Sequence, residues 1–459
     1  MRTQRASVVR IETISRWVPA LAATALALVA SSSVEPAAAA ANERDAAPSS
    51  PTFYREVLPI LQETCQECHR SAGTSYGGQL APMSLLTYDE ARPWAKAIAK
   101  NVESREMPPW DAHPRHRGVF LNERSLEDDE IATLVRWANR GAAAGDPADA
   151  PPPKVFANRD GWMIGEPDLV VKMPEPFFVA DDVKDLYAAF YVDLTDEMLP
   201  RDMWITAFQC KPGSRIIHHF NAHLAYPDEG GGLPEPPSFP VEGQIAPPRA
   251  GTYIGGIASG TDSLPLPEGF GIPLQQGTRV TFDVHYHKEP GADTGVWDQS
   301  EIGFLLTDRP PSRVMGGNLD RRGPLAVYQI EIPPGAKNHQ LGPVTATFTE
   351  DSEIINLMPH MHMRGAAARF EAIYPDGTRE ILLDVPTYDF SWQTVYRYKE
   401  LKLVPAGTRI EYTAWYENTP ERGEKYGFDP TQTVTFGEES TDEMMMGFVS
   451  SAAVVPSDS

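Results

Sequence analysis

Beyond about residue 168, the sequence consists of short runs in which apolar and polar side chains alternate, separated by turns that contain proline and glycine. Successive side chains of a strand point to opposite faces, so this alternation predicts strands with one buried face, and no long helix is indicated. The clearest runs cover residues 215–226, 279–287, 353–363, 409–416 and 444–449. Their length and number predict two antiparallel β-sandwich (jelly-roll) domains, at residues 166–311 and 312–459.

Charge and cysteine content limit the possible partners. The chain has 40 Lys and Arg residues against 63 Asp and Glu residues, which gives a formal net charge of −23. This excess of negative charge argues against nucleic acids and anionic membranes as partners, so we expect a soluble acidic protein. Three cysteines cannot build a disulfide framework, and we expect Cys210 to be a small buried apolar residue.

The first residues follow the order of a secretory signal: basic residues, then an apolar run, then small residues. We predict a signal peptide at residues 1–41, a flexible tether at residues 42–51, and a periplasmic or secreted protein without membrane contact after cleavage. The apolar run at residues 17–30 is shorter than the ~20 residues that a transmembrane helix needs. An uncleaved N-terminal anchor is the alternative.

A Cys-x-x-Cys-His motif follows a segment whose apolar spacing predicts a helix that begins after Thr52. The thiols of Cys65 and Cys68 are then one helical turn apart and match the two vinyl groups of a haem, with His69 as axial ligand. A zinc or redox cysteine pair is the alternative, but the following histidine and the absence of a second pair favour one covalently bound haem c. We therefore predict a small all-α cytochrome c-like domain at residues 52–146, followed by a proline-rich linker at residues 147–165.

The sixth haem ligand is expected to be a methionine, because a thioether raises the reduction potential. Met107 precedes Pro108 and Pro109, which would fix an extended loop between two predicted helices. Met83 is the rival candidate. His113 and His116 flank this loop and are expected to be solvated.

The segment Leu357-Met358-Pro359-His360-Met361-His362-Met363-Arg364 contains the clearest metal-binding pattern of the later part of the chain. In an extended strand His360 and His362 point to the same side and can hold one metal ion. Imidazole together with thioether favours copper that cycles through Cu(I), because soft sulfur stabilises the reduced ion. Two histidines are an incomplete site, so further ligands are expected elsewhere.

Other histidines lie in two of the predicted strands. His218 and His219 are adjacent, and a regular strand would place them on opposite faces, so a shared ion requires a bulge or a strand end. Alternate apolar residues at positions 280–286 leave His285 and His287 on the polar face of their strand. His223 and His287 are interpreted as outer-sphere or solvated residues, and the remaining methionines, Met358, Met361, Met363, Met445 and Met446, as packing residues.

Four pieces occur in one order along the chain: His218-His219, Leu266-Pro267-Glu268-Gly269 leading to Val284-His285-Tyr286, His360-x-His362, and Thr441-Asp442-Glu443-Met444. With these pieces, residues 166–449 resemble the copper type II, ascorbate-dependent monooxygenases, the family of peptidylglycine α-hydroxylating monooxygenase and dopamine β-monooxygenase. The resemblance implies two copper ions with an open, solvent-filled cleft between them. It implies a three-imidazole electron-transfer copper at His218, His219 and His285, and a catalytic copper at His360, His362 and Met444.

These expectations combine into a copper monooxygenase that hydroxylates a substrate C–H bond with dioxygen. Ascorbate, the fused haem, or both would supply the electrons, with a periplasmic electron donor as partner. The substrate would be a small molecule or peptide-like compound, but the family's substrate-anchoring residues are not identifiable in this sequence. A haem and copper protein for electron transfer or copper binding, without oxygenase activity, is the alternative, and a binding or assembly module that kept the scaffold is a third.

Overall fold

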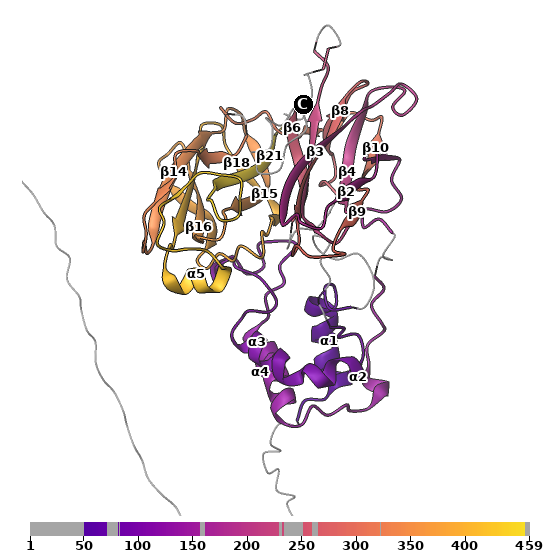
Figure 1. Ribbon diagram of the computed structural model, residues 1–459, viewed down its shortest axis with the longest axis vertical. Helices are drawn as coiled ribbons and strands as arrows, with labels where there is room; N and C mark the ends of the chain where they lie inside the picture. Colours follow the sequence, from indigo (N-terminus) through magenta and orange to yellow (C-terminus); the bar gives the residue numbers. More distant parts are fainter. Residues whose placement is uncertain are drawn as a thin grey trace, which may run out of the picture. The chain divides into compact units, whose positions relative to one another are not determined.

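The computed structural model describes residues 50–70, 81, 83–156, 161–228, 232–233, 251–258, 265–321 and 323–454 (Figure 1). Strands contain 39% of these residues and helices 15%, so the described chain is mostly β-structured. The predicted fold class, a small all-α cytochrome c-like domain followed by two antiparallel jelly rolls, is therefore wrong. No large all-α domain is evident in the described part, and the strands form several sheets, one of which contains a parallel pair.

The helical elements are short, and all but one lie before residue 150. They are η1 (Phe53–Val57), α1 (Leu58–Ile60), η2 (Leu61–Cys65), α2 (Tyr88–Ala91), η4 (Arg92–Trp94), α3 (Ala95–Glu103), η5 (Pro114–His116), α4 (Asp128–Asn139), η6 (Pro147–Asp149) and α5 (Pro420–Tyr426). η1, α1 and η2 follow one another without a break, with Pro59 inside the run, and α2, η4 and α3 likewise form one run that contains Pro93. Fully buried Phe53, Leu61 and Trp137 join these elements in a small apolar cluster.

Residues 169–314 form two larger sheets and a two-stranded ribbon. Their strands are β1 (Leu169–Lys172), β2 (Phe177–Val179), β3 (Asp185–Asp193), β4 (Met203–Lys211), β5 (Ile217–Ala225), β6 (Thr252–Ala258), β7 (Phe270–Leu274), β8 (Arg279–His287), β9 (Val296–Asp298), β10 (Glu301–Thr307) and β11 (Arg313–Val314). The strand orders are β1-β10-β4-β7-β11, β3-β8-β5-β6 and β2-β9, with β11 parallel to β7. Phe282 of β8 and Phe304 of β10 are fully buried in one cluster, so the two larger sheets share a core.

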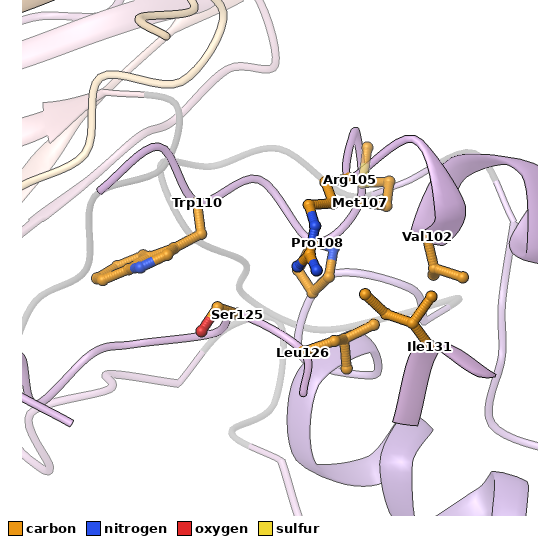
Figure 2. A pocket seen from close by; sticks show the side chains of 8 residues that line it. All are labelled: Val102, Arg105, Met107, Pro108, Trp110, Ser125, Leu126 and Ile131. Carbon is orange, nitrogen blue, oxygen red and sulfur yellow. The ribbon is translucent and has the colours of Figure 1, made fainter. Parts of the chain in front are cut away.

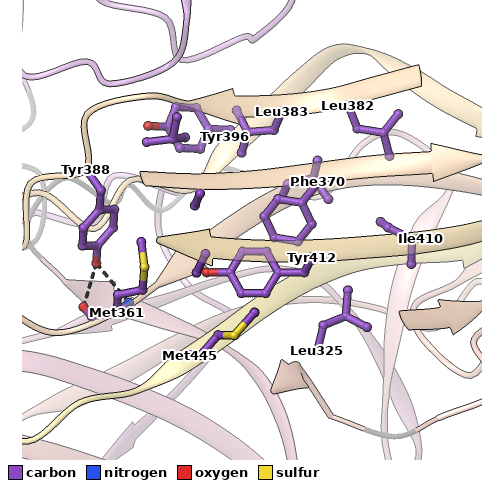
Figure 3. Close-up of a cluster of buried hydrophobic side chains, with 14 of the residues drawn as sticks. Leu325, Met361, Phe370, Leu382, Leu383, Tyr388, Tyr396, Ile410, Tyr412 and Met445 are labelled. Atoms are coloured by element: carbon purple, nitrogen blue, oxygen red, sulfur yellow. Dashed lines mark hydrogen bonds between the residues drawn. The ribbon is translucent and has the colours of Figure 1, made fainter. Parts of the chain in front are cut away.

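Residues 325–453 form a second pair of larger sheets. The strands are β12 (Leu325–Val327), β13 (Glu331–Ile332), β14 (His339–Thr347), β15 (Ser352–His360), β16 (Gly365–Ile373), β17 (Arg379–Val385), β18 (Tyr396–Val404), β19 (Arg409–Tyr416), β20 (Val434–Thr435) and β21 (Met445–Ala453). The orders are β12-β21-β15-β18, β14-β19-β16-β17 and β13-β20. Figure 3 shows Phe370, Tyr412 and Met445 packed in the core that these sheets share.

The predicted signal peptide at residues 1–41 and most of the tether at residues 42–51 lie outside the described residues. Within the part of the chain that the structure covers, no helix has the length and apolar character that crossing a membrane requires.

Candidate functional site

Three histidines from two neighbouring strands form a compact cluster. β5 and β8 pair antiparallel with His219 opposite His285, and a register shift lies between Ile217 and His219. This irregularity provides the bulge that a shared site for His218 and His219 requires. Their Nδ1 atoms are 3.4 Å apart, and one ligand nitrogen from each of the three histidines lies within 4.8 Å of the other two. The three side chains can therefore hold one metal ion.

Burial favours the neutral form of His218 and His285, and the neutral imidazole is the form that binds metal ions. Desolvation, reinforced by the nearby His285 and His287, lowers the pKa of His218 to about 3. Desolvation also lowers the pKa of His285, although a hydrogen bond to Asp185 acts in the opposite direction. Nδ1 of His285 is buried and has no hydrogen-bond partner, so a metal ion would satisfy this atom.

Asp185 at the start of β3 contacts two histidines with one carboxylate oxygen. Its Oδ1 lies 2.9 Å from Nε2 of His285 and 2.8 Å from Nδ1 of His287. Burial alone would raise the pKa of Asp185, but these two hydrogen bonds hold it below its ordinary value. With Nε2 bound to the carboxylate, His285 is fixed in the tautomer that leaves Nδ1 for a metal ion. The ring of Tyr187 stacks on His285 with 4.0 Å between centroids and fixes its plane.

A second pair of histidines lies at the end of β15. The sequence predicted a strand that includes both histidines. The strand ends at His360, however, and His362 lies in the following loop. The two rings are nevertheless neighbours, with centroids 5.4 Å apart. Nδ1 of His360 lies 2.6 Å from Oε1 of the buried Gln393, which leaves Nε2 as the metal-binding nitrogen. Desolvation lowers the pKa of His362 well below its ordinary value, and its buried Nδ1 has no hydrogen-bond partner.

A fully buried carboxylate joins this pair to the third predicted ligand. Oε1 of Glu443 accepts hydrogen bonds from the backbone N–H groups of His362 and Met444, and Oε2 accepts one from Arg364 at 2.9 Å. Burial raises the pKa of Glu443 to about 7, although these backbone donors oppose the shift. Because one oxygen accepts from both residues, the backbones of His362 and Met444 are adjacent. The side chain of Met444 is buried, since the residue is 4% exposed.

The two histidine clusters meet at one aromatic ring. The centroid of Phe390 lies 5.7 Å from that of His218 and 6.0 Å from that of His362. Phe390 is 8% exposed, so it fills this position. The open, solvent-filled cleft that the resemblance implies stays a prediction.

The Cys-x-x-Cys-His motif lies at the end of η2. The backbone N–H groups of Cys68 and His69 both donate to the carbonyl of Cys65, so the two cysteines are one turn apart. Burial raises the pKa of the Cys65 thiol to about 11 and also raises that of Cys68. The buried Nδ1 of His69 has no hydrogen-bond partner.

The two candidate sulfur ligands have different surroundings. The side chain of His69 hydrogen-bonds the backbone of Met83. Met107 lines a cavity of about 40 Å³ together with the apolar side chains of Val102, Leu126 and Ile131 (Figure 2). The choice of Met107 over Met83 stays a prediction.

Sequence reasoning missed four side chains that contact the candidate ligands: Asp185, Phe390, Gln393 and Glu443. Each is distant in sequence from the histidine it contacts, by 100 residues between Asp185 and His285. His287 is exposed and contacts Asp185, whereas His223 is 5% exposed and lies 3.6 Å from Asp283, so His223 is not solvated. Met361 and Met445 are fully buried in the second core, as their interpretation as packing residues requires.

No protein-family model matches the chain, and no curated protein matches it. Solved structures that align with it include a Paenibacillus xanthan lyase, with 10% identity, a TM-score of 0.17, and coverage of 67% of this chain and 28% of the lyase. Another is the Sulfolobus turreted icosahedral virus, with 10% identity, a TM-score of 0.12, and coverage of 66% of this chain and 100% of the viral chain. The tandem CBM22 domain of Paenibacillus barcinonensis Xyn10C aligns with 10% identity, a TM-score of 0.12, and coverage of 64% and 95%. The chain thus spans about a quarter of the lyase, and these TM-scores carry no functional argument.

Proposed function

We propose that this protein is a copper-dependent monooxygenase that hydroxylates a C–H bond of a small-molecule or peptide-like substrate with dioxygen. The observation that carries the proposal is the meeting of two histidine clusters at Phe390, one with three imidazoles and one with two imidazoles beside Met444. When bound, two copper ions would supply two electrons, so that one oxygen atom enters the substrate and the other leaves as water.

The donor sets favour copper. His218, His219 and His285 offer three imidazoles that can share one ion. Nδ1 of His285 and Nδ1 of His362 are buried without a hydrogen-bond partner. At the second site the thioether of Met444 adds a soft ligand, which suits an ion that cycles between Cu(II) and Cu(I). Zinc does not need such a ligand, because it has no redox chemistry.

The surrounding residues have positioning roles in this proposal. Asp185 and Gln393 each hold one histidine nitrogen and thereby direct the other nitrogen of the ring to the ion. Glu443 fixes the backbones of His362 and Met444 against each other. Gln393 and Glu443 are buried and limit the access of water to the second site, and Phe390 lies between the two sites.

A haem c at Cys65, Cys68 and His69 would be the internal electron source, in addition to ascorbate or in its place. The raised thiol pKa values and the unpartnered Nδ1 of His69 fit a thioether-linked group with an axial imidazole. The haem would be reduced by an external one-electron donor.

A haem and copper protein that transfers electrons or binds copper, without oxygen chemistry, is the second candidate. The position of Phe390 favours it, because a buried ring near both His218 and His362 occupies part of the space that a substrate between the two sites would need.

Elemental analysis and a pyridine haemochrome assay on exported protein, followed by measurement of dioxygen uptake with ascorbate, test the proposal. We expect one haem and two copper ions, with one copper lost in His219→Ala and the other weakened in Met444→Ala. Full metal content without reductant-dependent dioxygen uptake or product formation in a substrate screen would favour the second candidate. Protein that binds no copper would contradict both.

A further inference from the structure

Residues 110–122 pack along the edge of the second sheet pair. Phe120 forms an isolated antiparallel bridge with Tyr398 of β18, and Leu121 donates a backbone hydrogen bond to Arg397 at 2.7 Å. Lys399 donates to Val119 at 2.9 Å. This segment, which we call the strap, thereby extends the sheet beyond its edge strand β18.

Side chains fix the strap at both ends. The backbone N–H of Asp384 donates to Nε2 of His116 at 3.0 Å, and that of His113 donates to the Asp384 carbonyl at 2.8 Å. His116 is 7% exposed, so the prediction that it is solvated was wrong. Asn122 donates to the Val395 carbonyl at 2.7 Å and accepts from the Arg397 N–H at 3.1 Å.

An aromatic contact continues from the strap toward the candidate catalytic site. The ring of Trp110 meets that of Tyr396 edge-on, with 5.1 Å between centroids. Tyr396 is fully buried and pairs with Leu357 on β15, the strand that ends at His360. Three residues before Tyr396, Gln393 contacts Nδ1 of His360.

The same residue also lies next to a candidate haem ligand. Trp110 is three residues from Met107, and both side chains line the same cavity (Figure 2). Arg124, just after the strap, interacts electrostatically with the Cys68 thiol as well as with Asp111 and Tyr396. Trp110 thus contacts Tyr396, near the support of His360, and lines the cavity that Met107 also lines.

We propose that the strap, through Trp110 and Tyr396, is the internal route by which an electron enters the copper pair, and that it enters at the His360–His362 site. The inference rests on the proposed haem and copper content. With both groups bound, each transfer would oxidise one ferrous haem iron to ferric and reduce one cupric ion to cuprous, with no proton required. A second electron, supplied after the external donor had reduced the haem again, would reach the His218, His219 and His285 site across the position of Phe390.

Flash photoreduction of the haem by a flavin semiquinone, in anaerobic protein whose haem and copper contents have been measured, tests this route. Haem reoxidation is followed by its absorbance, and freeze-quench electron paramagnetic resonance reports which cupric signal disappears. In Trp110→Leu we expect reoxidation to slow about tenfold, with haem and copper contents unchanged. Trp110→Phe, which keeps a ring, should restore most of the rate.

Two further variants locate the entry point. In His360→Ala the photoreduced haem should stay reduced although the three-histidine site is loaded, whereas His219→Ala should still reoxidise it. Tyr253→Leu is the matched control, because Tyr253 contacts Phe448 of β21 away from the strap. A wild-type rate in Trp110→Leu or in His360→Ala would overturn this inference alone. Wild-type protein without haem or copper would overturn the proposed function, and this inference with it.

Discussion

Oδ1 of Asp185 lies 2.9 Å from Nε2 of His285. These residues belong to β3 and β8, which pair along their whole length. The same oxygen contacts His287, so one carboxylate from a neighbouring strand fixes two imidazoles. A ligand histidine held in this way keeps its tautomer and ring orientation before the ion arrives.

Asp185→Asn should therefore weaken copper binding at the three-histidine site by about 10- to 100-fold. The asparagine side chain has no negative charge, so its oxygen accepts hydrogen bonds from the two rings less strongly than the carboxylate oxygen does. Competition titration with a chromophoric chelator measures the affinity, and the exposed Asp182→Asn provides the control. Equal affinity in wild type and Asp185→Asn would show that the bulge alone positions the ligands.

Glu443→Gln should weaken copper binding at the second site and lower stability by about 1–3 kcal/mol. The glutamine NH₂ group would face a backbone N–H of His362, Met444 or Arg364, which leaves a buried donor without an acceptor. Copper content and denaturant unfolding measure the two effects, with the exposed Glu424→Gln as control. A variant that keeps two copper ions at wild-type affinity would contradict the positioning role of Glu443.

We expect the free energy of unfolding to depend on pH because of Asp111. Burial, together with the nearby Asp389, raises the pKa of Asp111 from 3.8 to about 7. Between these values the folded chain binds more protons than the unfolded chain, so the free energy of unfolding should fall as pH rises and level off above about pH 7. The side chain of Asp111→Asn does not titrate, so the variant should not show this fall in the free energy of unfolding.

The variant should therefore be more stable than wild type at about pH 8, by on the order of 2–4 kcal/mol relative to its effect at about pH 4.5. Denaturant unfolding at both pH values gives the difference, and Glu400→Gln, exposed on β18, should show no such change. A gain of the same size at both values would exclude titration of Asp111 as the cause.

Phe390→Ala should lower the free energy of unfolding by about 3–5 kcal/mol, because it empties a buried position in the second core. Both copper ions should remain, since the ring offers no ligand atom. Phe178→Ala removes a ring that is 45% exposed and should cost far less. Loss of either ion in Phe390→Ala, measured by elemental analysis, would show that the ring orients His218 or His362.

The alternating pattern predicted individual strands well and their burial only in part. The predicted strand at residues 279–287 is β8, and its apolar face is fully buried. Its polar face is buried as well, since Asp283 and His285 are 2% and 1% exposed. Tyr187 covers His285 from β3, a contact that strand pairing creates and that no local pattern contains.

The helix predicted to begin after Thr52 is confirmed, although the fold class is not. The run from Phe53 to Cys65 is helical throughout, as η1, α1 and η2 follow one another without a break and Pro59 lies inside the run. The residues that support the candidate metal ligands were missed because no local pattern contains them. Gln393 and Glu443 reach their histidines over 33 and 81 positions, and the sheet order alone brings them there.

In both sheet pairs the first strand pairs with a strand near the end of the same segment of the chain. β1 pairs with β10, and β12 at residues 325–327 pairs with β21 at residues 445–453. β21 also pairs with β15, and Met444 precedes it directly. Such long-range pairing delays formation of the complete sheet until the end of the chain has been synthesised. A nascent or truncated chain that stops before residue 444 would therefore lack both a central strand of that sheet and Met444, so the candidate metal site would be completed only when the sheet itself folds.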